Sequence, residues 1–272
     1  QGQQEAAASY YTQALAIRRA LGDRIGEGTT LHNQGVLLGS MGRGDEATHA
    51  FEQALGIERE LGDRGGEAAT LVNLGELARG QAHADRAARY YEQALEVERA
   101  AGNLAGEAAV LNALGTLAQS QRRLEAAGSC YEQALALQRQ VGDRAGEGLT
   151  HNYLGLLAYA QGRPAVAQRA FEQALALLDE TGQADAALTV RANLARLNSD
   201  HAASAASGDP VDVAPLAAEP APRPAPSVVA PEPAHSAVAP EPTEPPASAP
   251  APTEPPPAPT AAPKRGWWPW RR

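Results

Sequence analysis

Apolar and polar residues alternate with helical periodicity over the first 198 positions of the chain. One apolar stripe, at i, i+3, i+6 and i+7, predicts an amphipathic helix over residues 67–80. It contains Leu71, Leu74, Leu77 and Ala78. After a polar break, a second stripe predicts a helix over residues 86–101. It contains Ala87, Tyr91, Ala94, Leu95 and Val97. The pattern therefore predicts pairs of helices joined by short turns.

The helix pair returns every 40 residues. A pentapeptide that reads aromatic, variable, Gln, Ala, Leu begins at residues 11, 51, 91, 131 and 171. A fixed period of about 20 to 50 residues is typical of solenoids, in which each repeat buries its apolar face against its neighbours. The sequence therefore predicts an all-α fold, a solenoid of antiparallel helix pairs.

Glycine and acidic residues also recur at fixed phases. A glycine suited to the left-handed position after a helix precedes an Asp or Asn that can cap the next helix. These pairs are Gly22-Asp23, Gly62-Asp63, Gly102-Asn103 and Gly142-Asp143. A further glycine recurs in the middle of each first helix, at residues 35, 75, 115 and 155. Because glycine there costs roughly 1 kcal/mol relative to alanine, its recurrence predicts close packing against a neighbouring helix.

Proline usage divides the chain into segments. Of 21 prolines, only Pro164 falls within residues 1–198. We predict that this range is the solenoid, which begins with half a repeat and ends with a cap helix over residues 184–198. Residues 199–263 are rich in Pro, Ala and Glu, and they hold too few large apolar residues to offset their ordering entropy. We therefore expect a disordered linker there, followed by a basic, tryptophan-rich terminus over residues 264–272.

Charge and composition exclude several classes of function. The formal net charge is −9, and an acidic body argues against general nucleic-acid binding. Lys264 is the single lysine, so the chain has no phosphate-binding loop with its lysine. Cys130 is the single cysteine, and the histidines are scattered without metal-binding spacing. We expect no metal site, no cofactor and no enzymatic activity.

Several of the recurring residues form a family signature. Leu74-Gly75, Ala87, Tyr91 and Ala94 resemble the pattern of the tetratricopeptide repeat, and the next two units match it as well. The usual period of that family is about 34 residues. The longer period here is similar to a subgroup found in kinesin light chains, spindle-orientation adaptors and bacterial signalling proteins. The resemblance implies a right-handed superhelix that binds proteins or peptides in a concave groove lined by the first helices.

The resemblance also implies which side chains face that groove. One asparagine per unit lies just before the Leu-Gly phase, where its amide can both donate to and accept from a peptide backbone. These are Asn33, Asn73, Asn112, Asn152 and Asn193, and we predict the same groove role for His32, Glu76, Arg79, Tyr153 and Tyr159. The alternative is that the asparagines cap or bridge neighbouring helices.

The groove lacks one feature of related proteins. Chaperone-tail-binding members of the family clamp a carboxylate with Lys and Arg at positions that precede these asparagines. This chain has Thr29, Ala69, Ala109 and Leu149 there. These four residues carry no positive charge, which argues against an acidic C-terminal tail as the ligand.

The C-terminus combines every tryptophan of the chain with four cations. Its residues are Lys264, Arg265, Trp267, Trp268, Trp270, Arg271 and Arg272. Tryptophan favours the membrane–water interface and cations favour anionic lipid, so one interpretation is contact with an anionic membrane surface. The alternatives are an aromatic anchor that fills a pocket of a partner and a terminus without function.

These observations together favour a cytoplasmic, non-enzymatic adaptor that binds a protein or peptide in its groove. One alternative is the sensor or regulatory part of a larger signalling ATPase or transcriptional regulator, with its catalytic domain before Gln1. Another is a scaffold tethered to a membrane by its Trp/Arg tail.

Overall fold

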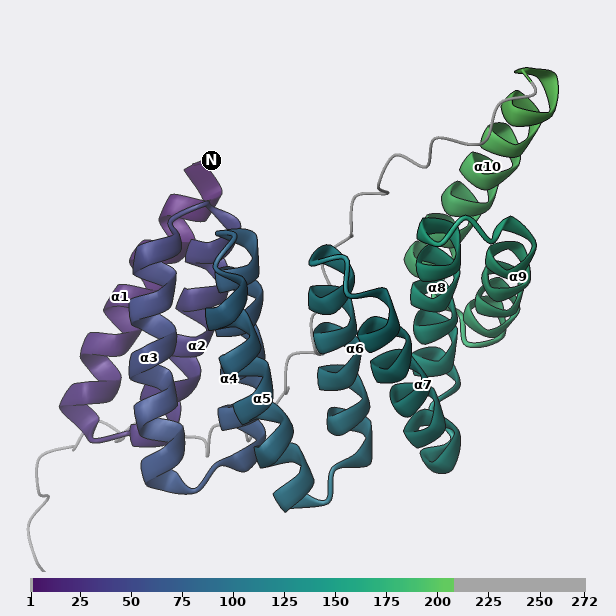
Figure 1. Ribbon diagram of the computed structural model, residues 1–272. Coiled ribbons are helices and arrows are strands. Elements are labelled where there is room, and N and C mark those ends of the chain that lie inside the picture. Colours follow the sequence, from purple (N-terminus) through teal and green to yellow (C-terminus); the bar gives the residue numbers. More distant parts are fainter. Residues whose placement is uncertain (1, 208–272) are drawn as a thin grey trace, which may run out of the picture. The chain divides into compact units, whose positions relative to one another are not determined.

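The computed structural model describes residues 2–207, with side chains through residue 201. Within this range the chain forms ten α-helices and no β-strand (Figure 1). The predicted all-α fold is therefore confirmed for this part of the chain. The expected linker after residue 207 and the expected anchor at residues 264–272 lie outside the described residues.

The helices alternate between the first and the second helix of the repeating unit. The first helices are α2 (Arg24–Ser40), α4 (Arg64–Gly80), α6 (Leu104–Ser120), α8 (Arg144–Ala160) and α10 (Ala184–Ser207). The second helices are α1 (Gly2–Leu21), α3 (Gly44–Leu61), α5 (Ala84–Ala101), α7 (Leu124–Val141) and α9 (Pro164–Glu180). None of the described helices is long and apolar enough to cross a lipid bilayer.

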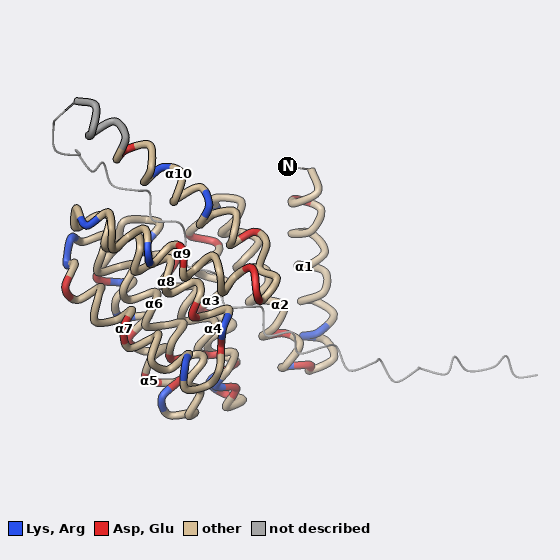
Figure 2. The backbone as a smooth tube through the Cα atoms, turned by 90° about the vertical axis from the view of Figure 1, so that its right-hand side faces the viewer, with Lys and Arg blue, Asp and Glu red and all other residues tan. Residues whose placement is uncertain are grey.

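Each helix packs mainly against its neighbours in the sequence. A first helix packs on the second helix of its own unit, and that second helix packs on the first helix of the next unit. The first helices also contact one another in order, from α2 through α4, α6 and α8 to α10. Adjacent second helices within residues 2–207 lie farther apart, and α3 and α5 are joined by long side chains, with Arg59 donating to Gln93 and Arg86 donating to Glu52. The first helices therefore form the inner layer of the solenoid. Figure 2 shows acidic and basic residues interspersed along the described helices.

Caps of two kinds fix the helix ends. Asp23, Asp63, Asn103 and Asp143 each accept a hydrogen bond from a backbone N–H three residues later, at 2.9, 2.9, 3.2 and 2.8 Å. Because the first N–H groups of a helix have no partner inside it, these side chains satisfy a donor and fix where each first helix begins. Glycines with φ of 67° to 72° end α3, α5 and α7. Both predicted types of cap are thus confirmed.

Helix boundaries differ from the predicted ones by a few residues. α4 begins at Arg64 rather than residue 67, because the helix starts directly after its cap. α5 begins at Ala84 rather than residue 86. α10 continues to Ser207, nine residues beyond the predicted end of the cap helix at residue 198.

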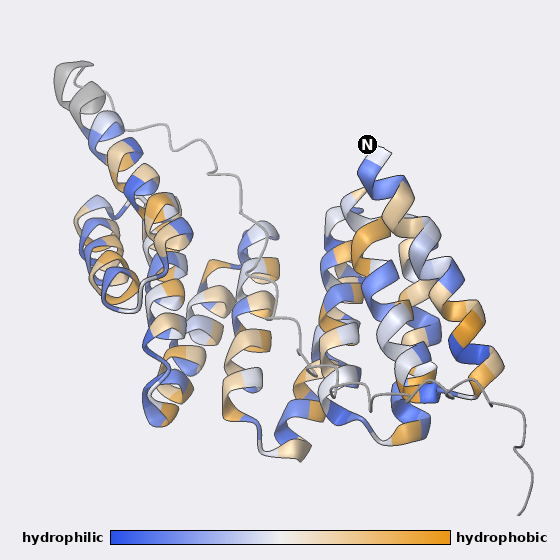
Figure 3. Cartoon of the chain, turned by 180° about the vertical axis from the view of Figure 1, so that it is seen from behind, coloured by the Kyte–Doolittle hydropathy of each residue, from blue (hydrophilic) through white to orange (hydrophobic). Residues whose placement is uncertain are grey.

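The recurring mid-helix glycines make room for aromatic rings. A Cβ placed on Gly35, Gly75, Gly115 or Gly155 would lie 2.6–2.7 Å from Cδ1 of the ring in the second helix of the same unit. Those rings belong to Phe51, Tyr91, Tyr131 and Phe171, which are 0–3% exposed. Close packing at these glycines is confirmed, and the contacting group is a side chain. Apolar residues recur along the helices between polar ones (Figure 3), as such packing requires.

Candidate functional site

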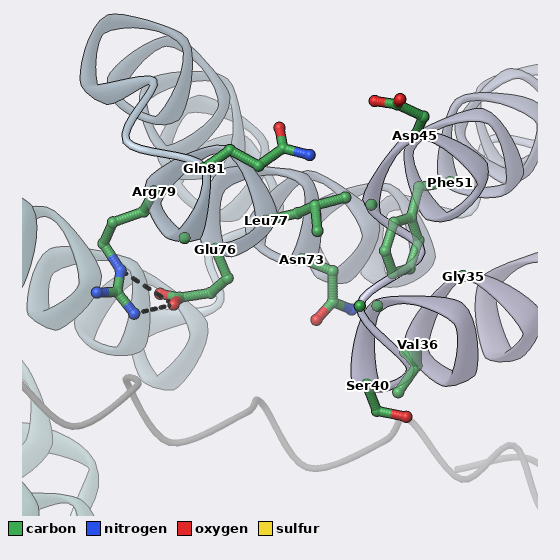
Figure 4. A pocket seen from close by; sticks show the side chains of 14 residues that line it. Gly35, Val36, Ser40, Asp45, Phe51, Asn73, Glu76, Leu77, Arg79 and Gln81 are labelled. Carbon is green, nitrogen blue, oxygen red and sulfur yellow. Dashed lines mark hydrogen bonds and ion pairs between the residues drawn. The ribbon is translucent and has the colours of Figure 1, made fainter. Parts of the chain in front are cut away.

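A pocket of about 640 Å³ opens between the first helices α2 and α4 and the start of α3. Its apolar lining includes Val36, Phe51 and Leu77, and its polar lining includes Asp45, Asn73, Glu76, Arg79 and Gln81 (Figure 4). Its volume lies within the range of about 300–1,000 Å³ that is usual for ligand pockets. Apolar walls with a few polar groups are also usual for such pockets.

The first full unit comprises α2 and α3, the second α4 and α5, the third α6 and α7, and the fourth α8 and α9. Comparison of the first unit with the second explains why the pocket is open in the first. In the second unit the Tyr91 hydroxyl donates to Oε1 of Glu76 at 2.6 Å, and Arg79 donates to Oε2 of Glu76 at 2.7 Å. The residues 40 positions earlier are Phe51, Val36 and Gly39. The first unit therefore lacks a hydroxyl and two long side chains at the same register. The space that these groups fill in the second unit is part of the pocket in the first.

Later units fill the corresponding positions with other side chains. In the third unit, the Tyr131 hydroxyl lies 3.1 Å from Oε1 of Gln119. In the fourth unit, Leu156 and Tyr159 are 8% and 5% exposed. Gly39 thus distinguishes the first unit from the three that follow, which have Arg79, Gln119 and Tyr159 at its register.

The charged groups of the pocket lie at two ends. Glu76 and Arg79 form a half-buried ion pair at one end. Burial, and then the carboxylate of Glu76, raise the pKa of Tyr91, so its hydroxyl stays protonated and donates to that carboxylate. The exposed side chain of Asp45 makes no hydrogen bond or ion pair with another described residue. Its carboxylate remains available to a ligand.

A chain of hydrogen bonds leads from the pocket into the core. Asn73 Nδ2 lies 3.3 Å from His32 Nε2, and His32 Nδ1 lies 2.7 Å from Thr70 Oγ1. The Thr70 hydroxyl donates to Glu58 Oε1 at 2.9 Å. Because that hydroxyl has one proton, it accepts from His32, which assigns the proton of the neutral ring to Nδ1. Nε2 then accepts from Asn73, so all three bonds point toward Glu58.

Glu58 is the buried end of this chain. It is 5% exposed, and its second oxygen, Oε2, is buried without a hydrogen-bond partner. Burial raises the pKa of Glu58 to about 7, although the hydrogen bond from Thr70 opposes this. Burial also lowers the pKa of His32. A buried carboxyl that loses its proton less readily than an exposed one fits this end of the polar chain.

The predicted asparagines mostly join neighbouring first helices. Asn112 donates to Thr150 at 2.8 Å, and Asn193 donates to Oδ1 of Asn152 at 3.0 Å. Asn73 bonds to His32 across α2 and α4. The alternative stated above, that the asparagines bridge helices, agrees with these bonds. Contact of any asparagine with a ligand stays a prediction. Asn33 is half-buried and its side chain bonds to no described residue.

The remaining predicted groove residues divide between the pocket and other units. Asn73, Glu76 and Arg79 line the pocket, and His32 lies one hydrogen bond behind it. Tyr153, 6% exposed, stacks on Tyr131 with ring centroids 5.5 Å apart. The buried Tyr159 donates its hydroxyl to Asp200. The structure therefore does not bring all ten predicted residues together.

Sequence reasoning missed several residues of this region. Phe51, Gly39 and Asp45 line the pocket, and Glu58 ends the hydrogen-bond chain. A signal for two of them exists in the repeat. Gly39 stands where the later units have Arg, Gln and Tyr, and Glu58 stands where the unit 80 residues later has Gln138. Among residues 2–207, no three His, Cys, Asp or Glu side chains gather as they would around a metal ion.

Comparisons with known proteins agree with this architecture. A family model described as tetratricopeptide repeat matches residues 26–100 and 106–180. BtubC (BKLC) from P. vanneervenii is structurally similar, with a TM-score of 0.57 and 21% identity over 72% of this chain and 91% of that chain. A putative kinesin light chain from Podosopora anserina, with nearly identical TPR-like repeats, gives a TM-score of 0.54 and 19% identity over 66% and 89%.

The apo form of RapI is a third similar structure, with a TM-score of 0.52 and 14% identity over 72% of this chain and 77% of that chain. At these identities the structural likeness bears on the fold alone. None of the curated proteins compared matches the sequence.

Proposed function

The chain belongs to the tetratricopeptide repeat family, and on that premise we propose that it is a non-enzymatic scaffold that binds an extended peptide segment of a partner protein. The segment lies along the first helices and is centred on the pocket between α2 and α4. The open pocket carries this proposal, because it combines an apolar floor with polar groups that have unused bonding capacity.

Polar groups at the pocket suit a peptide backbone. Asn73 uses its amide nitrogen toward His32, while its Oδ1 bonds to no described residue and can accept a peptide N–H. Asn33, one turn earlier on α2 than the pocket residue Val36, offers both its donor and its acceptor. An extended peptide has unpaired N–H and C=O groups along its length, so two amides on adjacent first helices can hold it in one register.

Selection of peptides on the full chain tests the proposal. Short random peptides displayed on phage are selected, and an enriched peptide is synthesised with a photo-crosslinking residue. We expect micromolar binding by fluorescence anisotropy and crosslinks to α2 and α4, located by mass spectrometry. Failure to enrich any peptide, or crosslinks confined to the second helices α3, α5 and α7, would refute the proposal.

A further inference from the structure

The pocket has a wall that can accommodate an apolar side chain. Phe51 of α3, Leu77 of α4 and Val36 of α2 provide apolar surface in its lining (Figure 4). Gly39 leaves the space between them open, because a Cβ placed on it would meet only the Ala47 Cβ, at 3.9 Å. Burial of apolar surface against such walls is favourable in proportion to the area removed from water. A bulky apolar group therefore gains most by entering here.

The charge of the pocket indicates what should stand next to that group. Its lining contains two carboxylates, Asp45 and Glu76, and one guanidinium, Arg79. Glu76 is already paired, since Arg79 and Tyr91 both donate to it. Asp45 lies at the opposite end from Arg79 and is unpaired among the described residues (Figure 4). A cation on the ligand is therefore the complement of this end.

We propose that this pocket is a selectivity pocket, which takes one bulky apolar side chain of the partner peptide while Asp45 pairs with a basic residue next to it. This inference rests on the proposed function, because it names the peptide chemistry that the same site recognises. The three residues Val36, Gly39 and Phe51 create the selectivity, since the second unit closes the same register with Glu76, Arg79 and Tyr91.

The chain itself supplies the variant that closes the pocket. Val36→Glu, Gly39→Arg and Phe51→Tyr together copy the trio of the second unit into the first. A Cβ at Gly39 meets no clash, so we expect the longer side chains of this variant to fit into the pocket and fill it. Thr116→Glu with Gln119→Arg is the matched control, because it builds the same trio with Tyr131 in the third unit, away from the pocket.

Selection and binding on the full chain test the inference. We expect the enriched peptides to share an apolar residue beside a basic one. We also expect the triple variant to raise the Kd of such a peptide by about tenfold or more, as loss of a buried anchor does. The control in the third unit should leave the Kd unchanged. Gly39→Gln, a single substitution that copies Gln119 of the third unit, provides a second variant that closes the pocket.

The charge is tested separately. Asp45→Asn should weaken binding by about threefold and reduce its dependence on salt, as expected for an exposed ion pair. Asp85→Asn, at the same register one unit later, carries the same change at the start of α5 and should have no effect.

The outcomes separate the two proposals. Peptides that bind with no apolar–basic pair, or that bind both closed-pocket variants as well as the unaltered chain, overturn the selectivity pocket and leave the scaffold function standing. Absence of any peptide binding overturns both.

Discussion

Glu58 is the residue whose ionisation should affect stability most visibly. Its pKa in the folded protein is raised by burial to about 7, above the ordinary value of 4.5. Asp63 and Glu67 add to this increase, while Thr70 and Arg59 oppose it. Between these two pKa values the folded state binds more protons than the unfolded state. Stability therefore falls as pH rises through this window and stays lower above it.

Replacement of Glu58 by glutamine should remove this loss. We expect Glu58→Gln to match the unaltered chain near pH 4.5 and to exceed its free energy of unfolding at pH 8 by on the order of 2 kcal/mol. Urea denaturation of the full chain at the two pH values measures the difference. An equal gain at both pH values would show that ionisation is not the cause.

A natural control lies 80 residues later. Gln138 stands at the register of Glu58 and accepts a hydrogen bond from Thr150 at 2.8 Å, and Asn112 stands at the register of His32. That chain is the same network built from neutral groups. Gln138→Glu should therefore destabilise the protein at pH 8 and much less near pH 4.5.

At the residue scale, the sequence predicted where residues lie on the helices better than it predicted which side chains they bond to. It placed one asparagine per unit on the first helices, and four of the five do face an adjacent first helix. Periodicity fixes the register of a residue but not what the facing helix offers it 38 to 41 residues away. Asn112 meets a threonine and Asn193 meets another asparagine, so only the packed side chains reveal these bonds.

Two glycines within helices should respond to alanine in opposite ways. Gly75 lies under the ring of Tyr91, which is 0% exposed and cannot move aside. Gly75→Ala should therefore destabilise the protein by about 1–3 kcal/mol through overpacking. Gly56 lies on the exposed face of α3, and a Cβ placed on it would meet no atom within 4 Å. Gly56→Ala should stabilise by up to about 1 kcal/mol, because alanine has the higher helix propensity.

Thermal unfolding of the full chain distinguishes these effects. We expect a lower Tm for Gly75→Ala and a higher one for Gly56→Ala. A higher Tm for both would mean that helix propensity outweighs the ring contact and that Tyr91 can shift.

At the element scale, the caps were predictable because their chemistry is local. An Asp or Asn before a helix and a glycine after one act within a few residues. The first residues of the helices were less predictable than the caps, because an apolar stripe marks buried positions and misses the exposed first turn. The end of α10 was missed because the stripe fades while Ala-rich sequence of high helix propensity continues to Ser207, before Gly208 and Pro210.

At the scale of the solenoid, the period determines the fold while leaving open which unit holds the site. All units share the glycine and aromatic positions that set the packing. The pocket depends on a departure from the period at Gly39, where the later units have Arg79, Gln119 and Tyr159, and on how α2 and α4 pack. A repeat consensus averages such departures away.

Nearest-neighbour packing also predicts how far along the solenoid the loss of one buried side chain should lower stability. Leu178 of α9 is 0% exposed and belongs to a core cluster that extends from Ala118 to Leu197. Leu71 of α4, also 0% exposed, belongs to a cluster that extends from Leu38 to Leu117. Each deletion to alanine should cost about 2–5 kcal/mol locally. Because each repeat contacts only its neighbours, the loss should decline with distance along the solenoid.

Hydrogen exchange of the full chain, followed by mass spectrometry, measures this decline. Leu178→Ala should lower the protection of amides in α8 to α10 and spare those in α2 to α4. Leu71→Ala should reverse the pattern, so each variant is the control for the other. Equal loss of protection in all ten helices in both variants would contradict nearest-neighbour packing and show that residues 2–207 unfold as one cooperative unit. The selectivity pocket would then depend on the stability of α9 as strongly as on that of α4.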